Sequence, residues 1–200
     1  MNSPEKTFDF SAIILAAGNS SRMKKPKFSL KYSGDISFLE NILIKLQEAG
    51  CRQSIVVLNS DGEKHLKDNP FTLPTNTIIT INKHPEWERF YSLQCGLHAS
   101  GTKYYSFILN VDNPFVETDI LKALYDQKDK ADYVFPTFKG KGGHPIMISP
   151  RVTKDILAEE NMQTNLKDFL SHYPKKEVEV SDSRILANIN TTEEYRRLFL

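Results

Sequence analysis

The feature that most constrains the fold is an alternation of short apolar runs with segments of helical periodicity. The apolar run at 12–15 is followed by a helical period at 38–49, which ends at Gly50, and then by the apolar run at 54–58. The alternation continues with predicted strands at 76–81, 104–111 and 131–136, and with predicted helices at 61–67, 90–100 and 116–127. This alternation predicts an α/β fold, with a mainly parallel sheet and helices on both of its faces.

The rhythm changes after Phe138. From there the pattern predicts, in order, a flexible turn at 139–144, a short strand at 145–149, a helix over 150–173, short strands at 177–180 and 185–189, and a last helix at 191–200. Thr191 is a candidate N-cap of that last helix. No repeat or linker interrupts the chain, so residues 1–200 are predicted to form a single α/β/α layered domain, with residues 1–10 as a frayed tail.

Composition argues against several classes of function. The 200 residues are 40% hydrophobic and 26% charged, with a formal net charge of +1, so neither nucleic acid nor a membrane is an expected partner. No apolar run approaches the roughly 18 residues that a membrane span needs. Cys51 and Cys95 have no metal-binding spacing, which favours a reduced cytoplasm. The oligomeric state stays open.

The segment at 13–27, IILAAGNSSRMKKPK, combines a strand, a turn of small residues and clustered positive charge. Backbone N–H groups in a turn of such small residues can bind phosphate oxygens, because the backbone can approach the ligand closely. The cations that follow the turn, which can neutralise phosphate charge, are Arg22, Lys24, Lys25 and Lys27. The alternative is an ordinary turn followed by solvated lysines. A P-loop and a three-glycine dinucleotide fingerprint are excluded, because Gly18 is the only glycine of the segment.

A second informative position is Asp112, which directly follows the predicted strand at 104–111. The carboxyl ends of parallel strands share one edge of a sheet, where ligands bind, so Asp112 is expected beside the small-residue turn. A carboxylate there can bind a magnesium ion that also carries phosphate oxygens and water. The alternative is an N-cap or turn residue before Pro114.

The sequence LAAGNSSRMKKPK resembles the signature of nucleotidyltransferases with the molybdenum-cofactor-type fold, Leu-Ala-Ala-Gly-x-Ser-x-Arg-Met-Gly-x-x-Lys. The positions that match are Leu15, Ala16, Ala17, Gly18, Ser20, Arg22, Met23 and Lys27. The match fails at Lys24, where the family usually has glycine. The resemblance extends from Ile13 to about Tyr195 and implies a Rossmann-like nucleotidyltransferase fold.

The resemblance also implies roles in catalysis and nucleotide binding. Arg22 would hold the β- and γ-phosphates, Lys27 would neutralise the α-phosphate, and Asp112, in a variant of the family's Asp-x-Pro motif, would bind Mg²⁺. Ser92, in a segment similar to the family's Ser-Leu-x-x-Gly-Leu, would help hold the base. The full set predicted to bind the nucleotide is Leu15, Ala16, Ala17, Gly18, Ser20, Arg22, Lys27, Ser92 and Asp112.

Two further motifs resemble the family's acceptor and metal segments. The sequence Asn188-Ile189-Asn190-Thr191 is similar to the motif that supplies a second metal ligand, which implies Asn188 as that ligand and Asn190 near the acceptor. The Gly-His-Pro turn at 143–145 implies that His144 faces the acceptor. A helix-capping turn and an ordinary surface histidine are the respective alternatives.

The predicted activity is Mg²⁺-dependent transfer of a nucleoside monophosphate from CTP or GTP to a phosphate-bearing small-molecule acceptor, with release of pyrophosphate. Molybdopterin is the first acceptor to consider, and a sugar or alcohol phosphate is the alternative. A nucleotide-sensing module without catalysis is a second alternative, because positions 24, 188 and 192 depart from the family pattern. The motif at 112–114 favours the cytidylyl branch and the motif at 188–191 the guanylyl branch.

Overall fold

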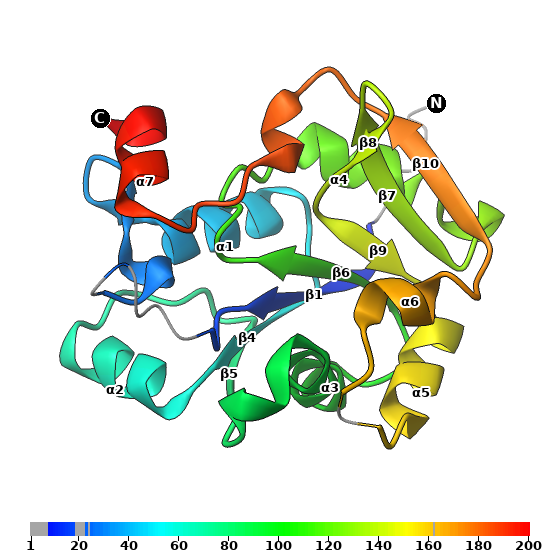
Figure 1. Cartoon of the computed structure of the whole chain (residues 1–200), viewed down its shortest axis with the longest axis horizontal. Helices are drawn as coiled ribbons and strands as arrows, with labels where there is room; N and C mark the ends of the chain where they lie inside the picture. Colours follow the sequence, from blue (N-terminus) through cyan, green and yellow to red (C-terminus); the bar gives the residue numbers. More distant parts are fainter. Residues whose placement is uncertain (1–7, 19–22, 24, 162) are drawn as a thin grey trace, which may run out of the picture.

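The computed structural model of the chain describes residues 8–18, 23, 25–161 and 163–200. A central sheet has the strand order β10-β7-β9-β6-β1-β4-β5, and β8 joins it by pairing with β7 (Figure 1). Its strands are β1 (Phe10–Leu15), β4 (Gln53–Leu58), β5 (Thr77–Ile81), β6 (Tyr105–Asn110), β7 (Tyr133–Phe138), β8 (Lys141–Gly142), β9 (Ile146–Ile148) and β10 (Lys175–Glu179). Only the pairs that involve β8 or β9 are antiparallel within this described sheet, which confirms the predicted mainly parallel α/β fold.

Helices cover both faces of this sheet. They are α1 (Phe38–Glu48), α2 (Ser60–Asp68), α3 (Glu88–Ser100), α4 (Thr118–Tyr125), α5 (Pro150–Ala158), α6 (Leu166–Leu170) and α7 (Thr192–Phe199). Short 3-10 turns at η1 (Lys27–Ser29), η2 (Pro85–Trp87), η3 (Lys128–Lys130) and η4 (Ser183–Leu186), and a hairpin of β2 (Lys31–Ser33) and β3 (Ile36–Ser37), complete the described elements. Within those residues, no helix is long and apolar enough to cross a membrane.

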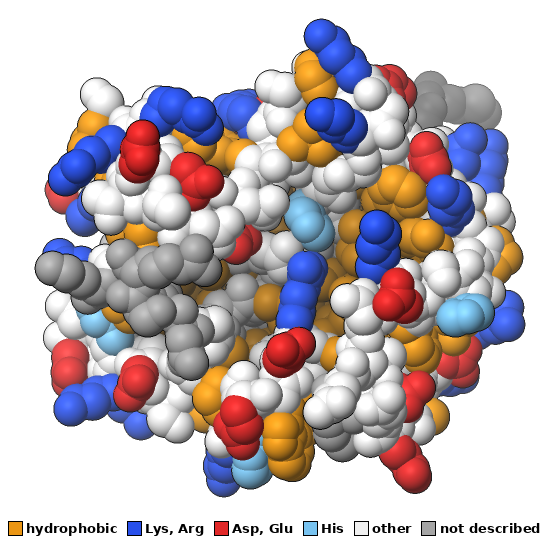
Figure 2. Space-filling view, in the orientation of Figure 1, with side chains coloured by type: hydrophobic (Ala, Val, Ile, Leu, Met, Phe, Trp, Pro, Cys, Tyr) orange, Lys and Arg blue, Asp and Glu red, His pale blue; other side chains and the backbone are white. Residues whose placement is uncertain are grey.

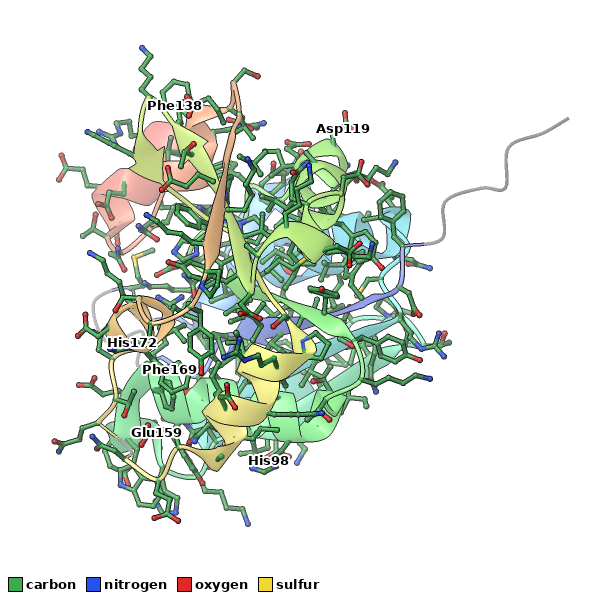
Figure 3. All side chains as sticks on the ribbon, turned by 90° about the vertical axis from the view of Figure 1, so that its right-hand side faces the viewer. His98, Asp119, Phe138, Glu159, Phe169 and His172 are labelled. Carbon is green, nitrogen blue, oxygen red and sulfur yellow. The ribbon has the colours of Figure 1, made fainter. Side chains whose placement is uncertain are left out.

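Strand β1 shows how the sequence builds the layers. Successive side chains of a strand point to opposite faces of the sheet. Ala12 and Ile14 accordingly pack in the cluster that contains α1 and α4, while Ile13 and Leu15 pack in the cluster that contains α3, α5 and α6. Figure 3 shows the result from the side, with Asp119 of α4 on one side of the sheet and His98 of α3 on the other. A strand buried on both faces must be apolar throughout, which explains the uninterrupted run.

The register of the central strands brings the ends of β1 and β6 together. Both strands are parallel and adjacent, and Leu15 pairs with Asn110 at the end of the ladder. The chain leaves both strands at the same edge, where Val111 N donates a hydrogen bond of 3.2 Å to Leu15 O. The turn of small residues after β1 and Asp112 after β6 therefore lie at one edge of the sheet, as the sequence predicts.

The predicted continuous helix over 150–173 is wrong. Helix α5 ends at Ala158 and α6 begins only at Leu166. The side chain of Gln94 donates hydrogen bonds of 2.9 and 2.8 Å to Ile156 O and Glu159 O, so a tertiary contact occupies carbonyls that a longer helix would use. Asn165 then caps a new helix, because its side chain accepts bonds from the first backbone N–H groups of α6.

Two smaller predictions also need correction. The segment at 185–189 is not a strand: the 3-10 turn η4 covers its start, and Asp182 initiates that turn by accepting a hydrogen bond from Arg184 N. The segment at 139–144 contains β8, which folds back onto β7 in a tight hairpin. The N-cap prediction for Thr191 is confirmed, because Thr191 and Glu194 form a reciprocal capping box. The other predicted elements are present with ends shifted by a few residues.

Gly96 lets α3 approach the sheet. A Cβ atom at this position would overlap Ile13 Cγ2 and reach Val57 Cγ2 at 3.0 Å. We expect Gly96→Ala to lower the free energy of unfolding by about 1–3 kcal/mol, because overpacking costs more than the helix propensity that alanine contributes. Urea denaturation measures this change. His98→Ala on the exposed side of α3 is the control and should stay within about 0.5 kcal/mol of the wild type. Equal stability of the Gly96 and His98 variants would contradict the close approach.

Candidate active site

A cavity of about 370 Å³ opens at the carboxyl edge of β1 and β6. Its lining residues are Leu15, Ala16, Ala17, Gly18, Lys27, Pro85, Glu88, Arg89, Ser92, Asn110, Val111, Asp112, His144 and Asn188. Figure 2 shows a histidine and basic side chains gathered around the hollow in the centre of this face. Open α/β sheets bind ligands at this edge, so this cavity is the candidate active site.

Lys27 connects three segments of the chain at the cavity. It follows Pro26 at the start of η1, and its Nζ lies 3.4 Å from Asp112 Oδ2 and 2.7 Å from Asn190 Oδ1. The backbone joins the same segments, since Ile189 N donates a hydrogen bond of 2.8 Å to Asp112 O. The lysine and the aspartate, 85 positions apart in the sequence, thus meet in one cleft.

The carboxylate of Asp112 has one oxygen without a partner. Oδ1 is buried and has no hydrogen bond, while Oδ2 faces Lys27. A buried oxygen of this kind is costly unless a cation or a donor pairs with it. Asn188 lines the same cavity and is exposed, so its side-chain oxygen is accessible to an ion. One carboxylate and one amide suit Mg²⁺, which usually takes few protein ligands and keeps water and phosphate oxygens. Within the described ranges, no group of three or more His, Cys, Asp or Glu forms a closed metal site.

Ser92 is part of a buried network at the start of α3. Its hydroxyl donates to Glu88 O at 3.1 Å and accepts from Asn82 Nδ2 at 2.9 Å. Asn82 is fully buried, and its side-chain oxygen accepts a bond from His84 N. Ser92 therefore braces the loop that precedes the helix, while its side of the cavity stays open to a ligand. Periodicity did not indicate the role of Asn82, because its partner lies across a loop.

His144 is held against the cavity by the 3-10 turn η4 and by strand β7. His144 N donates to Ile185 O at 3.0 Å, and Gly143 N donates to Pro136 O at 2.8 Å. The amide Nδ2 of Asn110 lies 3.2 Å from His144 Nε2. Because this amide nitrogen can only donate, Nε2 accepts and the proton of the neutral ring lies on Nδ1. Nδ1 is buried and has no partner. The ring thus lines the cavity while its Nδ1–H group is enclosed by the protein.

Burial, together with the positive charge of Arg89 and against the opposing negative charge of Asp112, lowers the pKa of His144 to about 4. Because the folded protein has the lower pKa, the unfolded chain binds the extra proton between pH 6.5 and about 4, and stability falls as the pH falls through this window. We expect the wild type to lose about 3 kcal/mol more than His144→Asn between pH 7 and pH 4. Urea denaturation at both pH values measures this difference. Equal losses in the two proteins would contradict the neutral, buried imidazole.

A second cavity of about 530 Å³ adjoins the first. It shares Glu88, Arg89 and His144 with the first cavity and extends over β7, β10 and α6. Tyr133 and Phe135 form its aromatic wall, with ring centroids 5.6 Å apart and an interplanar angle of 15°. Lys167 and Lys175 add positive charge to its rim. On this side of the face in Figure 2, hydrophobic side chains lie between basic ones.

The structure places the predicted residues as follows. Leu15, Ala16, Ala17, Gly18, Lys27, Ser92, Asp112, His144 and Asn188 all line the first cavity. Asn190 does not line it but accepts a hydrogen bond from Lys27. Ser20 and Arg22 lie outside the described residues, as does Lys24. Sequence reasoning missed Arg89, Tyr133 and Phe135. The alternation of two aromatic residues along β7 was the available signal for the aromatic wall.

The sheet topology and the cavity at its carboxyl edge place this chain among the nucleotidyltransferases. Residues 12–178 match the MobA-like NTP transferase domain, so the chain belongs to this family. The resemblance that the N-terminal signature indicates is thereby confirmed.

Two relatives and one solved protein illustrate the similarity. The chain is 25% identical over 199 residues to a probable molybdenum cofactor guanylyltransferase of Natranaerobius thermophilus, with 94% of each chain covered. It is 26% identical over 208 residues to a protein of the same name from Clostridium perfringens, with 94% of this chain and 95% of the relative covered. The crystal structure of Rv0371c from Mycobacterium tuberculosis superposes with a TM-score of 0.79 at 23% identity, covering 96% and 98% of the two chains, and shows the same fold. A second crystal structure of Rv0371c is a complex with manganese, with a TM-score of 0.76 at 20% identity over 95% and 97% of the two chains.

Proposed function

We propose that this nucleotidyltransferase transfers a nucleoside monophosphate from GTP or CTP to the phosphate of a molybdopterin-type acceptor and releases pyrophosphate. The observation that carries the proposal is the meeting of Lys27 with Asp112 in the cavity lined by the backbone of 16–18. The names of the relatives favour molybdopterin as the acceptor and GTP over CTP as the donor. The Asn-Ile-Asn sequence at 188–190 also favours GTP.

The chemistry needs positioning and charge neutralisation more than proton transfer. An acceptor phosphate oxygen forms a bond to the α-phosphorus, and the bond between the α-phosphorus and the bridging oxygen to the β-phosphate breaks. The electron pair leaves with pyrophosphate. Lys27 would neutralise charge at the α-phosphate, and the N–H groups of Ala17 and Gly18 would bind phosphate oxygens, since the N–H of Ala16 already donates to Val57 O.

Asp112 and Asn188 are the residues that would hold a divalent ion in this cavity. A divalent ion held there would neutralise part of the charge that develops on pyrophosphate. Mg²⁺ is the proposed ion because both proposed ligands, Asp112 and Asn188, offer oxygen atoms. The manganese complex of Rv0371c shows that a protein of this fold can hold a divalent cation.

Both cysteines are free thiols, with Cys51 buried and Cys95 partly buried. This supports the expected cytoplasmic location, since a reducing compartment keeps such thiols unpaired. The proposed partners are the nucleotide and the phosphate-bearing acceptor, both small molecules, with no nucleic acid and no membrane.

Pyrophosphate release tests the proposed function. The protein is incubated with each of GTP, CTP, ATP and UTP, with Mg²⁺ or Mn²⁺, and with molybdopterin, a hexose 1-phosphate or methylerythritol phosphate. We expect metal-dependent release with GTP and molybdopterin, and less with CTP. Pyrophosphate release with a sugar or alcohol phosphate but not with molybdopterin would identify that phosphate as the acceptor instead. Nucleotide binding without release for every acceptor would contradict the proposed activity and favour a sensor.

A further inference from the structure

Arg89 lies at the border between the two cavities. It is among the residues that line both of them, together with Glu88 and His144. Among the described residues, the Arg89 guanidinium makes no hydrogen bond or ion pair. After burial, the positive charge of Arg89 is the next cause that lowers the pKa of His144. The negative charge of Asp112 opposes the lowering of the Arg89 pKa by burial. The N–H donors along the edge of the Arg89 guanidinium are therefore available to a ligand at the border between the two cavities.

The residue before Arg89 has an unusual backbone. Glu88 has φ 62° and ψ −159°, a region that residues other than glycine rarely occupy. The network described above keeps it there, because Ser92 Oγ donates to Glu88 O and Asn82 donates to Ser92. Conformations of this kind cost free energy and concentrate at functional sites. The backbone conformation of Glu88 sets the path by which the chain enters α3. It therefore also sets the position of Arg89 at the border between the two cavities.

The chemistry on the two sides of Arg89 differs. On one side lie Lys27 and Asp112, the phosphate and metal groups of the first cavity. On the other side lies the aromatic wall of Tyr133 and Phe135, with Lys175 Nζ 5.8 Å from the Phe135 ring centroid. An aromatic wall with a basic rim suits a flat ring that carries a negative group. The phosphate of such a ligand would have to point back through the border to reach the first cavity.

We propose that Arg89 binds the attacking phosphate monoester of the acceptor at this border, while the acceptor ring occupies the second cavity. The assignment rests on the proposed function and adds a residue that directly contacts the acceptor. A bidentate guanidinium holds two oxygens of the monoester and leaves the third directed at the α-phosphorus. That oxygen forms the new bond, and the electron pair of the broken bond leaves with pyrophosphate on the side of Lys27.

Direct binding of a fluorescent pterin tests the assignment without turnover. A pterin phosphate monoester and the same pterin without phosphate are titrated into the full-length wild type and into Arg89→Gln and Arg89→Lys. We expect the wild type to bind the pterin phosphate about 10- to 100-fold more tightly than the pterin without phosphate. This is the gain in affinity that a charge-assisted hydrogen bond contributes. Arg89→Gln should lose that preference, and Arg89→Lys should keep part of it. The affinity of each variant for a non-hydrolysable GTP analogue should stay unchanged.

Arg52→Gln is the matched control, because Arg52 lies outside both cavity linings, immediately before β4, where it pairs with Asp9 and stacks on Tyr104. It should bind both pterins as the wild type does. An unchanged phosphate preference in Arg89→Gln overturns the assignment, and so does a variant that loses GTP and pterin affinity together. If the wild type ignores pterins but binds a sugar phosphate in an Arg89-dependent way, the role of Arg89 stands and the proposed acceptor fails. A wild type that binds none of these phosphates overturns both.

Discussion

Asp112→Asn is expected to lower kcat/KM for pyrophosphate release by about 10²- to 10³-fold. The substitution keeps the shape of the side chain and removes the carboxylate that faces Lys27 in the first cavity. Without that charge the divalent ion binds weakly, so the metal concentration for half-maximal activity should also rise. The assay is a titration of Mg²⁺ at saturating nucleotide and acceptor, with pyrophosphate as the readout.

The fold should tolerate this change. Asp112 Oδ1 has no hydrogen bond, and Asp112 Oδ2 contacts Lys27 at the long distance of 3.4 Å, so little native bonding is lost. Asp119→Asn, at an exposed position in the first turn of α4, is the matched control and should keep full activity. Wild-type turnover and metal dependence in Asp112→Asn would remove Asp112 from the site.

Lys27→Met is expected to reduce kcat by about 10²- to 10³-fold, with a smaller effect on the KM for the nucleotide. The reason is that charge at the α-phosphate and on the leaving group grows as the transition state forms, so the contact is stronger there than in the ground state. Steady-state kinetics with varied nucleotide separates the two parameters. A change confined to KM would show that Lys27 binds substrate and transition state equally.

Lys31→Met is the control for the loss of a lysine near this segment. Lys31 is exposed and pairs with Asp35 in the β2–β3 hairpin, outside the cavity lining. Lys27, in contrast, bonds to Asn190 and faces Asp112, so its replacement also loosens the segment at 188–190. Measurement of Tm for both variants distinguishes a loss of catalysis from a loss of folding.

Much of the site was predictable because it depends on where parallel strands end. Apolar runs followed by small or acidic residues mark the ends of β1 and β6, and adjacent parallel strands must bring those ends together. The family signature then indicated Lys27 and Asp112, and the structure places Lys27 Nζ 3.4 Å from Asp112 Oδ2. The helix at 150–173 was not predictable, because a side chain on α3 ends α5 by bonding its carbonyls.

The sequence by itself determined the layered α/β fold and the positions of the small-residue turn, Lys27 and Asp112 at one edge of the sheet, because periodicity and strand ends depend on neighbouring residues. Only the tertiary structure decided that Arg89 lies between two cavities and that its neighbour His144 has a lowered pKa. These features depend on contacts between distant segments, such as His144 with Asn110 and with Ile185. A side chain becomes buried, and comes under the influence of neighbouring charges, only when such segments pack together.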